Sequence, residues 1–316
     1  MHMTSLYIPS LTSAELDQFS SYTLIVACVG VGNVAQLACD LLIHNLDCDF
    51  VSSLNFKYSP SVVGIGISQL DRSQNLMTSS EVYANNKLRL AVLQIRAPPF
   101  SGCKQKYVKE LVNFLKTVKF QAVVLLSSSF ATVLKDEELN ASPLRYAVSS
   151  SFSVSDRERL EKLTCSPLTI YNDQLDYKLS VRYHLPGCGI ASYLFEKLVE
   201  LQDIPVCLLN FFTSEGDNSG DALYVVRYLD KWLQLTSQLT DNKSGFNWSP
   251  PPSWGFLFGT DLLTLYINFS YDKIFLTKYF WYFFGITVEL SLQKNLSLSV
   301  CIDIDCKHKL RLSYSK

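Results

Sequence analysis

The chain has 316 residues, of which 48% are hydrophobic and 18% charged, and its formal net charge is −1. This composition supplies enough apolar side chains for one large or two smaller globular domains, and it lacks the strongly basic character of nucleic-acid-binding proteins. The nine cysteines are an odd number without a C-x-x-C pattern, which favours reduced thiols in the cytoplasm or nucleus over a disulfide framework. The first residues lack a basic segment followed by a long apolar one, so no secretory signal is predicted.

The first third of the chain predicts strands that alternate with helices. Residues 22–29 form an apolar run typical of a buried strand, and apolar side chains at helical spacing in 34–42 predict a helix directly after it. A second strand is expected within 49–56. Residues 57–80 are rich in Ser, Gly and Asn and predict a long loop with a short apolar insert. Residues 81–96 predict two strands joined by a tight turn at their Asn-Asn pair.

The alternation continues to about residue 239. An amphipathic helix is expected at 103–118, and the continuous apolar run at 121–129 is typical of a parallel strand covered on both faces. The pattern further predicts a turn at 142–146, a short helix near 155–163, a Gly-rich turn and helix at 185–201, a buried strand at 205–213, and a polar turn and helix at 215–235. Such alternation indicates an α/β fold: a mostly parallel sheet with helices on both faces.

The C-terminal part has a different composition. Residues 240–254 are polar and then Pro-rich, which indicates a linker, and after Leu262 the chain is crowded with aromatic residues. The apolar stretch 275–290 contains two charged residues and is shorter than the ~20 residues that a membrane-spanning helix needs. No membrane association is therefore expected, although tethering through 274–290 stays as the weakest alternative.

One motif raises the question of enzymatic activity. Gly30, Gly32 and Ala35 follow the first predicted strand at the G-x-G-x-x-A spacing of a dinucleotide-binding turn. Such a site also needs an acidic residue at the end of the second strand, about 20 residues further on, where this chain has Ser52, Ser53 and Asn55. The simpler interpretation is a tight strand-to-helix turn without a cofactor. A nucleoside- or dinucleotide-binding enzyme that uses the Gly30–Gly32 turn remains the alternative.

Other candidate reactive groups have structural interpretations. The acidic residues after 214 do not form a calcium loop, because the positions that require Gly and Glu hold Ala222 and Tyr228. Asp217 or Asn218 is instead expected to cap the following helix. The serines at 127–129 lack a G-x-S-x-G context, and we expect their hydroxyls to cap the next turn. No catalytic, cofactor-binding or metal-binding residue is assigned.

Several segments occur in the order seen in one known family. They are VGVGNVAQLACDLLI (29–43), EVYANNKLRLAVLQIR (81–96), VVLLSSS (123–129), SPLRY (142–146), LPGCGI (185–190), FFTSEGDNSGDALYVVRYLDKWLQL (211–235) and PPSWGFLFG (251–259). From about residue 20 to about residue 260 the chain thus resembles the proteasome assembly chaperone 2 family. The family-motif residues, with a structural or interface role not yet assigned, are Gly30, Gly32, Asn33, Gln36, Pro186, Gly187, Gly189, Glu215, Gly216, Asp217, Asn218, Asp221, Trp254, Phe258 and Gly259.

The resemblance implies a fold and a function. Family members have a Rossmann-like three-layer domain similar to purine nucleoside phosphorylases, without known catalysis or cofactor. They form a heterodimer with proteasome assembly chaperone 1, bind alpha-type subunits of the 20S proteasome, promote alpha-ring formation and prevent off-pathway ring dimers. The expected partners are therefore these proteins, with no nucleic acid and no membrane, and the expected location is the cytoplasm and nucleus.

The C-terminus departs from the family pattern. Some family chaperones end in a hydrophobic–Tyr–any tripeptide, whereas here Tyr314 is third from last. Family members also tend to stop soon after the SW..LFG segment, and one hypothesis is that residues 262–316 are a gene-model extension. The expected organisation is an N-terminal segment (1–20), the α/β chaperone domain (21–239), a Pro-containing segment (240–261) and the atypical aromatic-rich tail (262–316).

Overall fold

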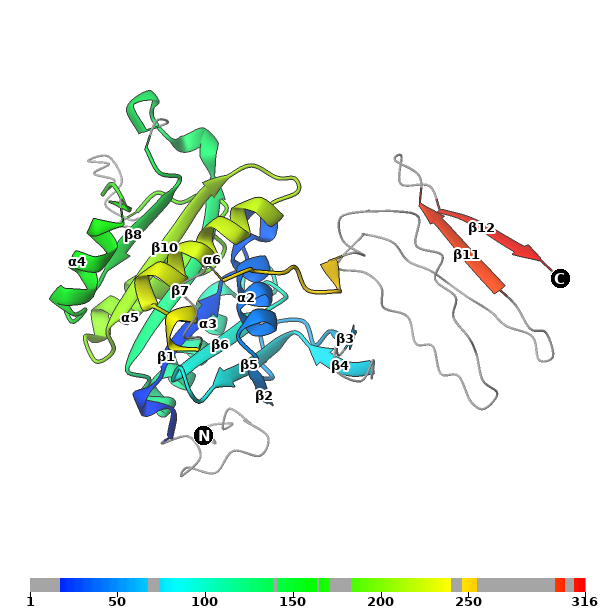
Figure 1. The fold of residues 1–316 in the computed structure, drawn as a ribbon, viewed down its shortest axis with the longest axis horizontal. Coiled ribbons are helices and arrows are strands. Elements are labelled where there is room, and N and C mark those ends of the chain that lie inside the picture. The colour runs from blue at the N-terminus through cyan, green and yellow to red at the C-terminus, as the bar shows by residue number, and fades with distance from the viewer. Residues whose placement is uncertain are drawn as a thin grey trace. The chain divides into compact units, whose positions relative to one another are not determined.

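The structure is a computed structural model of the whole chain. It describes residues 18–67, 74–138, 141–163, 165–170, 183–239, 246–254, 299–304 and 310–315. The chain divides into two compact units, Met1–Ser253 and Trp254–Lys316, and the first contains the α/β fold shown in Figure 1.

An eight-stranded sheet forms the centre of the first unit. Its four central strands, β6, β1, β7 and β10, run parallel to one another, while β5 and β8 pair antiparallel at either side of them. In spatial order the strands are β2 (Asp49–Ser53), β5 (Ser80–Asn85), β6 (Leu90–Ile95), β1 (Thr23–Ala27), β7 (Ala122–Phe130), β10 (Val206–Thr213), β8 (Leu144–Val148) and β9 (Ser166–Pro167). The predicted mostly parallel sheet is confirmed.

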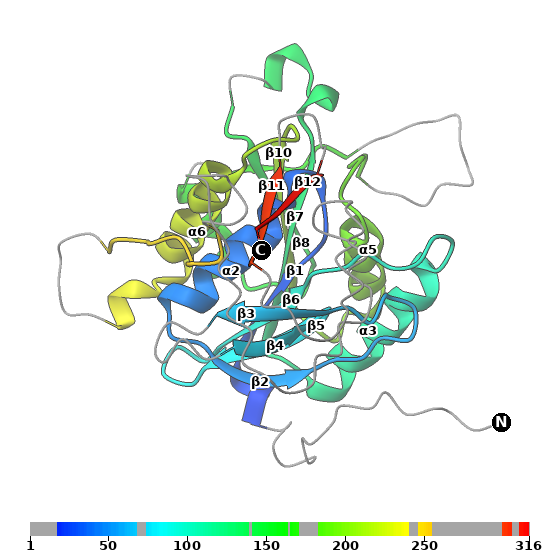
Figure 2. The same ribbon diagram turned by 90° about the vertical axis from the view of Figure 1, so that its right-hand side faces the viewer.

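Helices cover both faces of this sheet. In Figure 2, α2 (Val34–Asn45) and α6 (Ser219–Leu233) lie on one side, and α3 (Lys104–Val118) and α5 (Ala191–Leu201) lie on the other. The short helix α4 (Val154–Lys162) packs against α6. The predicted three-layer α/β architecture is therefore confirmed.

The apolar spacing in the sequence explains this layering. The face of β1 with Leu24 and Val26 packs in one core with Leu111 and Leu115 of α3 and Leu194 of α5. Because successive strand residues point to opposite faces, the intervening strand residues face α2 and α6. Both faces of the central strands are therefore buried, and their sequences are continuous apolar runs rather than alternating ones.

Two expectations about local structure were wrong. Residues 57–80 were expected to be a loop, but β3 (Val63–Ile67) and β4 (Gln74–Thr78) pair antiparallel as a separate two-stranded sheet. The glycines in the VGIGI run masked its alternation. Residues 142–146 were expected to form a turn, but β8 already begins at Leu144, where the chain pairs with the long strand β10.

The second unit is described only in part. Its strands β11 (Ser299–Ile304) and β12 (Leu310–Ser315) form an antiparallel pair. The apolar stretch 275–290, for which a membrane span was considered, lies outside the described residues. Among the residues that are described, no helix is long and apolar enough to cross a membrane.

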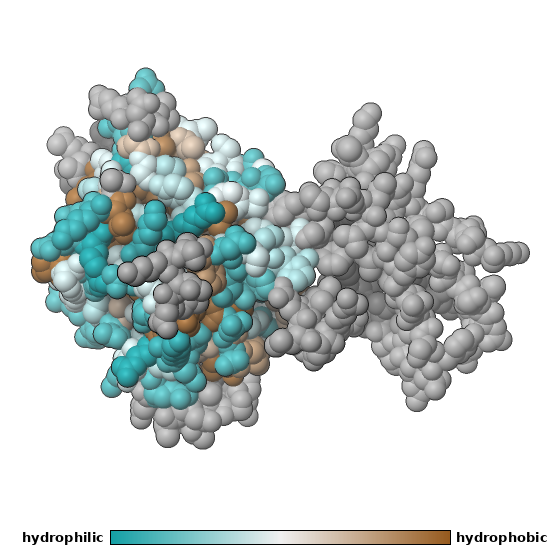
Figure 3. Space-filling view, viewed as in Figure 1, coloured by the Kyte–Doolittle hydropathy of each residue, from teal (hydrophilic) through white to brown (hydrophobic). Residues whose placement is uncertain are grey.

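On the face of the first unit seen in Figure 3, hydrophilic residues predominate among those that are coloured, and hydrophobic ones form separate small patches. Scattered apolar exposure of this kind is normal for a protein surface.

The seven cysteines between residues 28 and 207 are free, and five of them are buried. Cys28, Cys39 and Cys207 have no exposed surface, and burial raises the pKa of each thiol. In the native protein we expect iodoacetamide to alkylate these three roughly tenfold or more slowly than the partly exposed Cys103. Peptide mapping by mass spectrometry measures the rates, and urea-unfolded protein is the control. Equal rates in the native protein would contradict this packing.

Candidate functional site

The family-motif residues of three separate segments meet at one place. They lie in the turns that follow β1, precede α5 and follow β10, at the carboxyl ends of the parallel strands. The chain leaves β1 toward one edge of the sheet and leaves β7 toward the other, so β1 and β7 flank the point where strand order reverses. In open α/β sheets, ligands bind in the crevice at this point.

The turn after β1 has the backbone expected from its sequence. Gly30 is extended, Gly32 has a φ of 62° and Asn33 a φ of 53° immediately before α2. A Cβ on Gly30 would lie 2.7 Å from the carbonyl oxygen of Ser128 in the neighbouring strand β7. Gly30 therefore permits the close approach of turn and strand, and Gly32 permits the left-handed conformation. The tight strand-to-helix turn is confirmed.

The turn before α5 fills the crevice between β1 and β7. The Val31 amide donates to the carbonyl of Gly187 at 3.2 Å, and the Phe130 amide donates to the carbonyl of Pro186 at 3.1 Å. A Cβ on Gly189 would lie 2.1 Å from the Val29 carbonyl oxygen. Backbone of the chain itself thus bridges the two strand ends and occupies the position that a dinucleotide takes in enzymes of this topology.

The acidic turn after β10 has one exposed part and one buried part. Glu215, Gly216 and Asp217 are exposed, and the Asp217 carboxylate accepts a hydrogen bond from the Ser219 amide at 3.0 Å. The side chain and amide of Ser219 lower the pKa of Asp217. Asp217 therefore provides the expected interaction at the start of α6, while Asn218, the other capping candidate, makes no side-chain cap.

Asn218 turns inward instead, toward the motif turn after β1. It is only 4% exposed, and its amide nitrogen donates to the Thr213 hydroxyl at 2.7 Å and to the Asp221 carboxylate at 3.0 Å. A Cβ on Gly32 would lie 2.4 Å from the amide oxygen of Asn218. The space above Gly32, which a pyrophosphate occupies in dinucleotide enzymes, is therefore filled by this side chain.

Serine hydroxyls of β7 join the turns to the sheet. The Ser128 hydroxyl donates to the Val31 carbonyl at 2.6 Å, and the Ser129 hydroxyl donates to the amide oxygen of Asn210 in β10 at 2.9 Å. The expectation that these hydroxyls cap the following turn was wrong, because Ser128 donates to the turn after β1 and Ser129 donates to the neighbouring strand β10. Three small polar residues at the end of an apolar strand are the signal that sequence offers for such cross-links.

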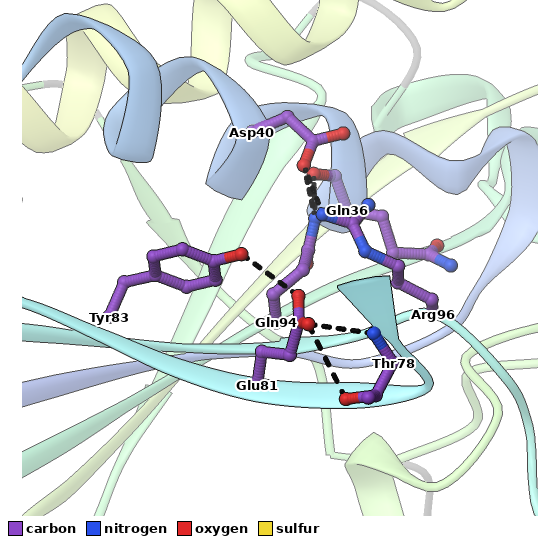
Figure 4. Close-up of polar contacts among 7 residues, drawn as sticks. All are labelled: Gln36, Asp40, Thr78, Glu81, Tyr83, Gln94 and Arg96. Atoms are coloured by element: carbon purple, nitrogen blue, oxygen red, sulfur yellow. Dashed lines mark hydrogen bonds and ion pairs between the residues drawn. The ribbon is translucent and has the colours of Figure 1, made fainter. Parts of the chain in front are cut away.

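A second polar cluster fixes α2 to the sheet (Figure 4). Gln94 of β6 has no exposed surface, and its amide nitrogen donates to the Gln36 carbonyl at 2.9 Å and to the Asp40 carboxylate at 2.7 Å. Arg96 pairs with the same Asp40 oxygen at 3.2 Å. Burial alone would lower the pKa of Arg96, but Asp40, with Tyr83 and other groups, raises it above its ordinary value. The motif residue Gln36 thus belongs to the anchor of the helix.

Glu81 extends this cluster to the base of the β3–β4 pair. It is 1% exposed and accepts hydrogen bonds from the Thr78 amide at 2.7 Å and the Tyr83 hydroxyl at 2.9 Å (Figure 4). Burial and the nearby Glu81 carboxylate raise the pKa of Tyr83. A buried carboxylate is tolerated here because its lone pairs are engaged. Sequence reasoning missed Glu81, Gln94 and Arg96, for which polar residues inside strands were the only signal.

The remaining motif residues belong to the C-terminal SW..LFG segment. Trp254 is the last residue described before the gap, and Phe258 and Gly259 lie outside the described residues. Within the described part of the chain, no group of three or more His, Cys, Asp or Glu side chains is arranged to hold a metal ion.

The chain matches known proteins over most of its length. The model of the PAC2 family matches residues 24–244. The chain belongs to the PAC2 family. Its relatives include proteins named proteasome assembly chaperone 2 from Danio rerio, 34% identical over 252 residues (78% of this chain, 95% of the relative), and from Nematostella vectensis, 35% identical over 247 residues (74% and 98%). The Homo sapiens protein of that name is 31% identical over 272 residues (81% and 98%).

Solved structures of the PAC2 family and its homologues show a more distant likeness. Pyrococcus furiosus PbaA, described as an archaeal homolog of proteasome-assembly chaperone, is 19% identical with a TM-score of 0.48, and the match covers 69% of this chain and 87% of PbaA. A PAC2 family protein from Streptomyces avermitilis is 15% identical with a TM-score of 0.40, covering 71% and 97%.

The relatives and the geometry agree on the question of catalysis. The curated PAC2 family relatives are named as chaperones and not as enzymes. In this chain the Pro186–Gly187 backbone and the Asn218 side chain fill the positions that a dinucleotide would need. Both findings count against the enzyme alternative that the Gly30–Gly32 turn suggested.

Substitution of Gly32 tests the packing at the strand ends. Gly32→Ala should lower the free energy of unfolding by at least ~1–3 kcal/mol, because Ala is strained at a φ of 62° and its Cβ collides with Asn218. The collision predicts that Gly32→Ala and Asn218→Ala together cost less than the sum of the two single changes. Urea unfolding measures each term. Gly220→Ala, in open space on α6, is the control and should be neutral or stabilising; strict additivity would contradict the contact.

Breaking the polar cluster beneath α2 should also destabilise the fold. In Arg96→Met the half-buried Asp40 carboxylate loses its cationic partner and keeps the hydrogen bond from Gln94, and we expect the free energy of unfolding to fall by about 1–3 kcal/mol. Lys197→Met is the matched control, because it removes an exposed ion pair with Glu200 and should cause no measurable change. Equal effects of the two substitutions in urea titrations would show that the cluster does not stabilise α2.

Proposed function

We propose that this chain is a chaperone of 20S proteasome assembly that works as one half of a heterodimer with proteasome assembly chaperone 1. The observation that carries the proposal is its 34–35% identity to proteins named proteasome assembly chaperone 2, over 95–98% of their length. The pair binds alpha-type subunits, promotes formation of the alpha ring and prevents off-pathway ring dimers. The chain acts in the cytoplasm and the nucleus.

The packing at the strand ends supports a mechanism without a nucleotide cycle. The crevice that would hold a nucleotide is filled by Gly187, Pro186 and Asn218. Partners would therefore be held by contact area and shape, on surfaces presented by a rigid sheet. Stable interfaces of this kind bury about 1,200–2,000 Å² and are apolar at their centre.

Affinity capture with mass spectrometry tests this proposal. The tagged chain, expressed in dividing cells, should recover alpha-type proteasome subunits and proteasome assembly chaperone 1. Because no nucleotide cycle is involved, treatment of the lysate with apyrase should leave the recovery unchanged. Recovery of neither partner contradicts the proposal, and recovery that is lost with apyrase contradicts the mechanism.

The assembly role itself is tested by depletion and rescue. Cells depleted of the endogenous chaperone should accumulate off-pathway alpha-ring dimers on native gels, and re-expression of this chain should remove them. The destabilised Gly32→Ala variant should rescue less, in proportion to the amount of folded protein. The Gly220→Ala control should rescue fully. Failure of the unchanged chain to rescue, at normal abundance, would contradict a role in ring formation.

A further inference from the structure

The outer side of α3 concentrates positive charge in a chain whose net charge is −1. Six exposed lysines within or beside α3 are here called the lysine face: Lys57, Lys104, Lys106, Lys109, Lys116 and Lys119. In Figure 2, α3 lies on the side of the sheet away from α2 and α6. Lys106, Lys109 and Lys116 are spaced at three and seven residues, so they line up along the solvent side of the helix.

None of these lysines takes part in an ion pair within the described residues. The ion pairs found there use other cations, namely Arg96, Arg145, Arg159 and Lys197. Glu110 is the one acidic residue in α3, and its carboxylate accepts a hydrogen bond from the backbone amide of Lys57 at 3.0 Å. The adjacent helix α5 contains Glu196, which lies near Cys188, and Glu200, which pairs with Lys197 at 2.7 Å. The lysine face therefore presents an excess of positive charge to solvent.

The start of α3 reverses the usual arrangement of charge on a helix. Negative side chains stabilise a helix N-terminus and positive ones disfavour it. The first turns of α6 and α4 contain Asp221 and Asp156, whereas those of α2, α3 and α5 contain no acidic residue, and that of α3 also contains Lys104 and Lys106. The lysines at the start of α3 oppose this preference and do not stabilise the helix. Residues that oppose a structural preference in this way are expected at functional sites.

Aromatic residues lie among these lysines. The Nζ atoms of Lys57 and Lys106 lie 5.8 and 5.6 Å from the centre of the Tyr58 ring. The Phe100 amide donates to the Tyr58 carbonyl at 2.9 Å, and the Phe100 side chain is 50% exposed. Protein interfaces typically have an apolar centre and a polar rim. Phe100 with the lysines around it has this composition.

We propose that the lysine face, together with Phe100, is a docking surface for an acidic segment of a partner protein. This part of the surface has lysines and no arginine, which favours an acidic protein segment. The planar guanidinium group of arginine is the group that binds phosphates and bases with two hydrogen bonds, whereas lysine acts as a point charge. The nearly neutral chain, with a net charge of −1, lacks the overall basic character expected of a nucleic-acid-binding protein. Lysines 106–116 span about 15 Å of helix, which an extended peptide of about five residues matches.

The probe for this surface is a fluorescein-labelled peptide of about ten residues, made of Glu and Asp with one central Leu. Fluorescence anisotropy measures its binding to the full chain. Between about 50 mM and about 300 mM NaCl the affinity should fall about tenfold or more, because exposed charge pairs are screened. Replacement of the central Leu by Ser should weaken binding if Phe100 contacts it.

Charge reversal locates the binding site. The triple variant Lys106→Glu, Lys109→Glu and Lys116→Glu should bind the peptide about tenfold more weakly at low salt. The matched control, Lys87→Glu, Lys162→Glu and Lys231→Glu, makes the same change of charge away from α3 and should bind within about twofold of the unchanged chain. If the Glu variant does not fold, Lys→Gln at the same three positions removes the charge without reversing it.

The remaining outcomes distinguish the other occupants. Equal loss in both triple variants, or no binding by the unchanged chain, overturns the proposal. Tighter binding of a single-stranded oligonucleotide of equal charge, or of phosphatidylserine vesicles, through the same three lysines also overturns it in favour of nucleic acid or membrane. Salt-sensitive self-association that the α3 variant abolishes, measured by light scattering, would assign the surface to a second copy of this chain. None of these outcomes depends on proteasome subunits.

Discussion

The close approach of three turns at the carboxyl ends of β1, β7 and β10 is the constraint on which the rest of the structure depends. A Cβ on Gly30, Gly32, Gly187 or Gly189 would lie between 2.1 and 2.7 Å from its nearest neighbouring atom. Those turns begin the helices α2 and α5 and contact the turn that begins α6. Both helical layers are therefore set in place by contacts that leave no room for a Cβ, with backbone at Gly30 and Gly189 and with side chains at Gly32 and Gly187.

The chain has the topology of a nucleotide-binding domain, but its packing leaves no space for a nucleotide at the usual position. In a dinucleotide enzyme the glycines of the first turn make room for a pyrophosphate. Here the same room is taken by Asn218 and by the backbone of Pro186 and Gly187. Backbone groups that would bind a ligand here form hydrogen bonds with other parts of the chain. These hydrogen bonds contribute to the stability of the fold and not to the affinity for a ligand.

The spacing of apolar residues correctly predicted the central strands, which are buried on both faces, and the helices, which are buried on one face. The central strands and the amphipathic helices were placed within a few residues, because apolar spacing reports directly on the faces that pack. The β3–β4 pair was missed because Gly64 and Gly66 interrupt its alternation, and the start of β8 was missed because a Ser-Pro pair resembled a turn. In both cases the strand depends on pairing with a distant segment, which local patterns do not contain.

The candidate site was predictable as a set of residues but not as an arrangement. The motifs around Gly32, Gly187 and Asn218 were recognised separately, and their spacing gave the turn at Gly32 correctly. Their mutual contact joins segments about 150–190 residues apart in the sequence, and nothing in a local pattern encodes such a contact. The roles of the buried polar residues Gln94 and Ser128 were missed for the same reason. The hydrogen-bond partner of a polar residue in a strand is a neighbour in space that the local sequence does not identify.

The distribution of charge gives the two layers different roles. Exposed Glu215 and Asp217 make the turn after β10 acidic, whereas the outer side of α3 is basic, so a chain with almost no net charge has distinct electrostatic faces. A binding protein without a nucleotide cycle has no chemical step to drive release of its partner. Contacts made by exposed lysines are individually weak and screened by salt, which allows a complex to form quickly and to yield when a tighter interface becomes available. In the proposed function the glycine junction and the exposed lysine side chains are complementary: the first would fix the shape that selects a partner, and the second would keep the association reversible.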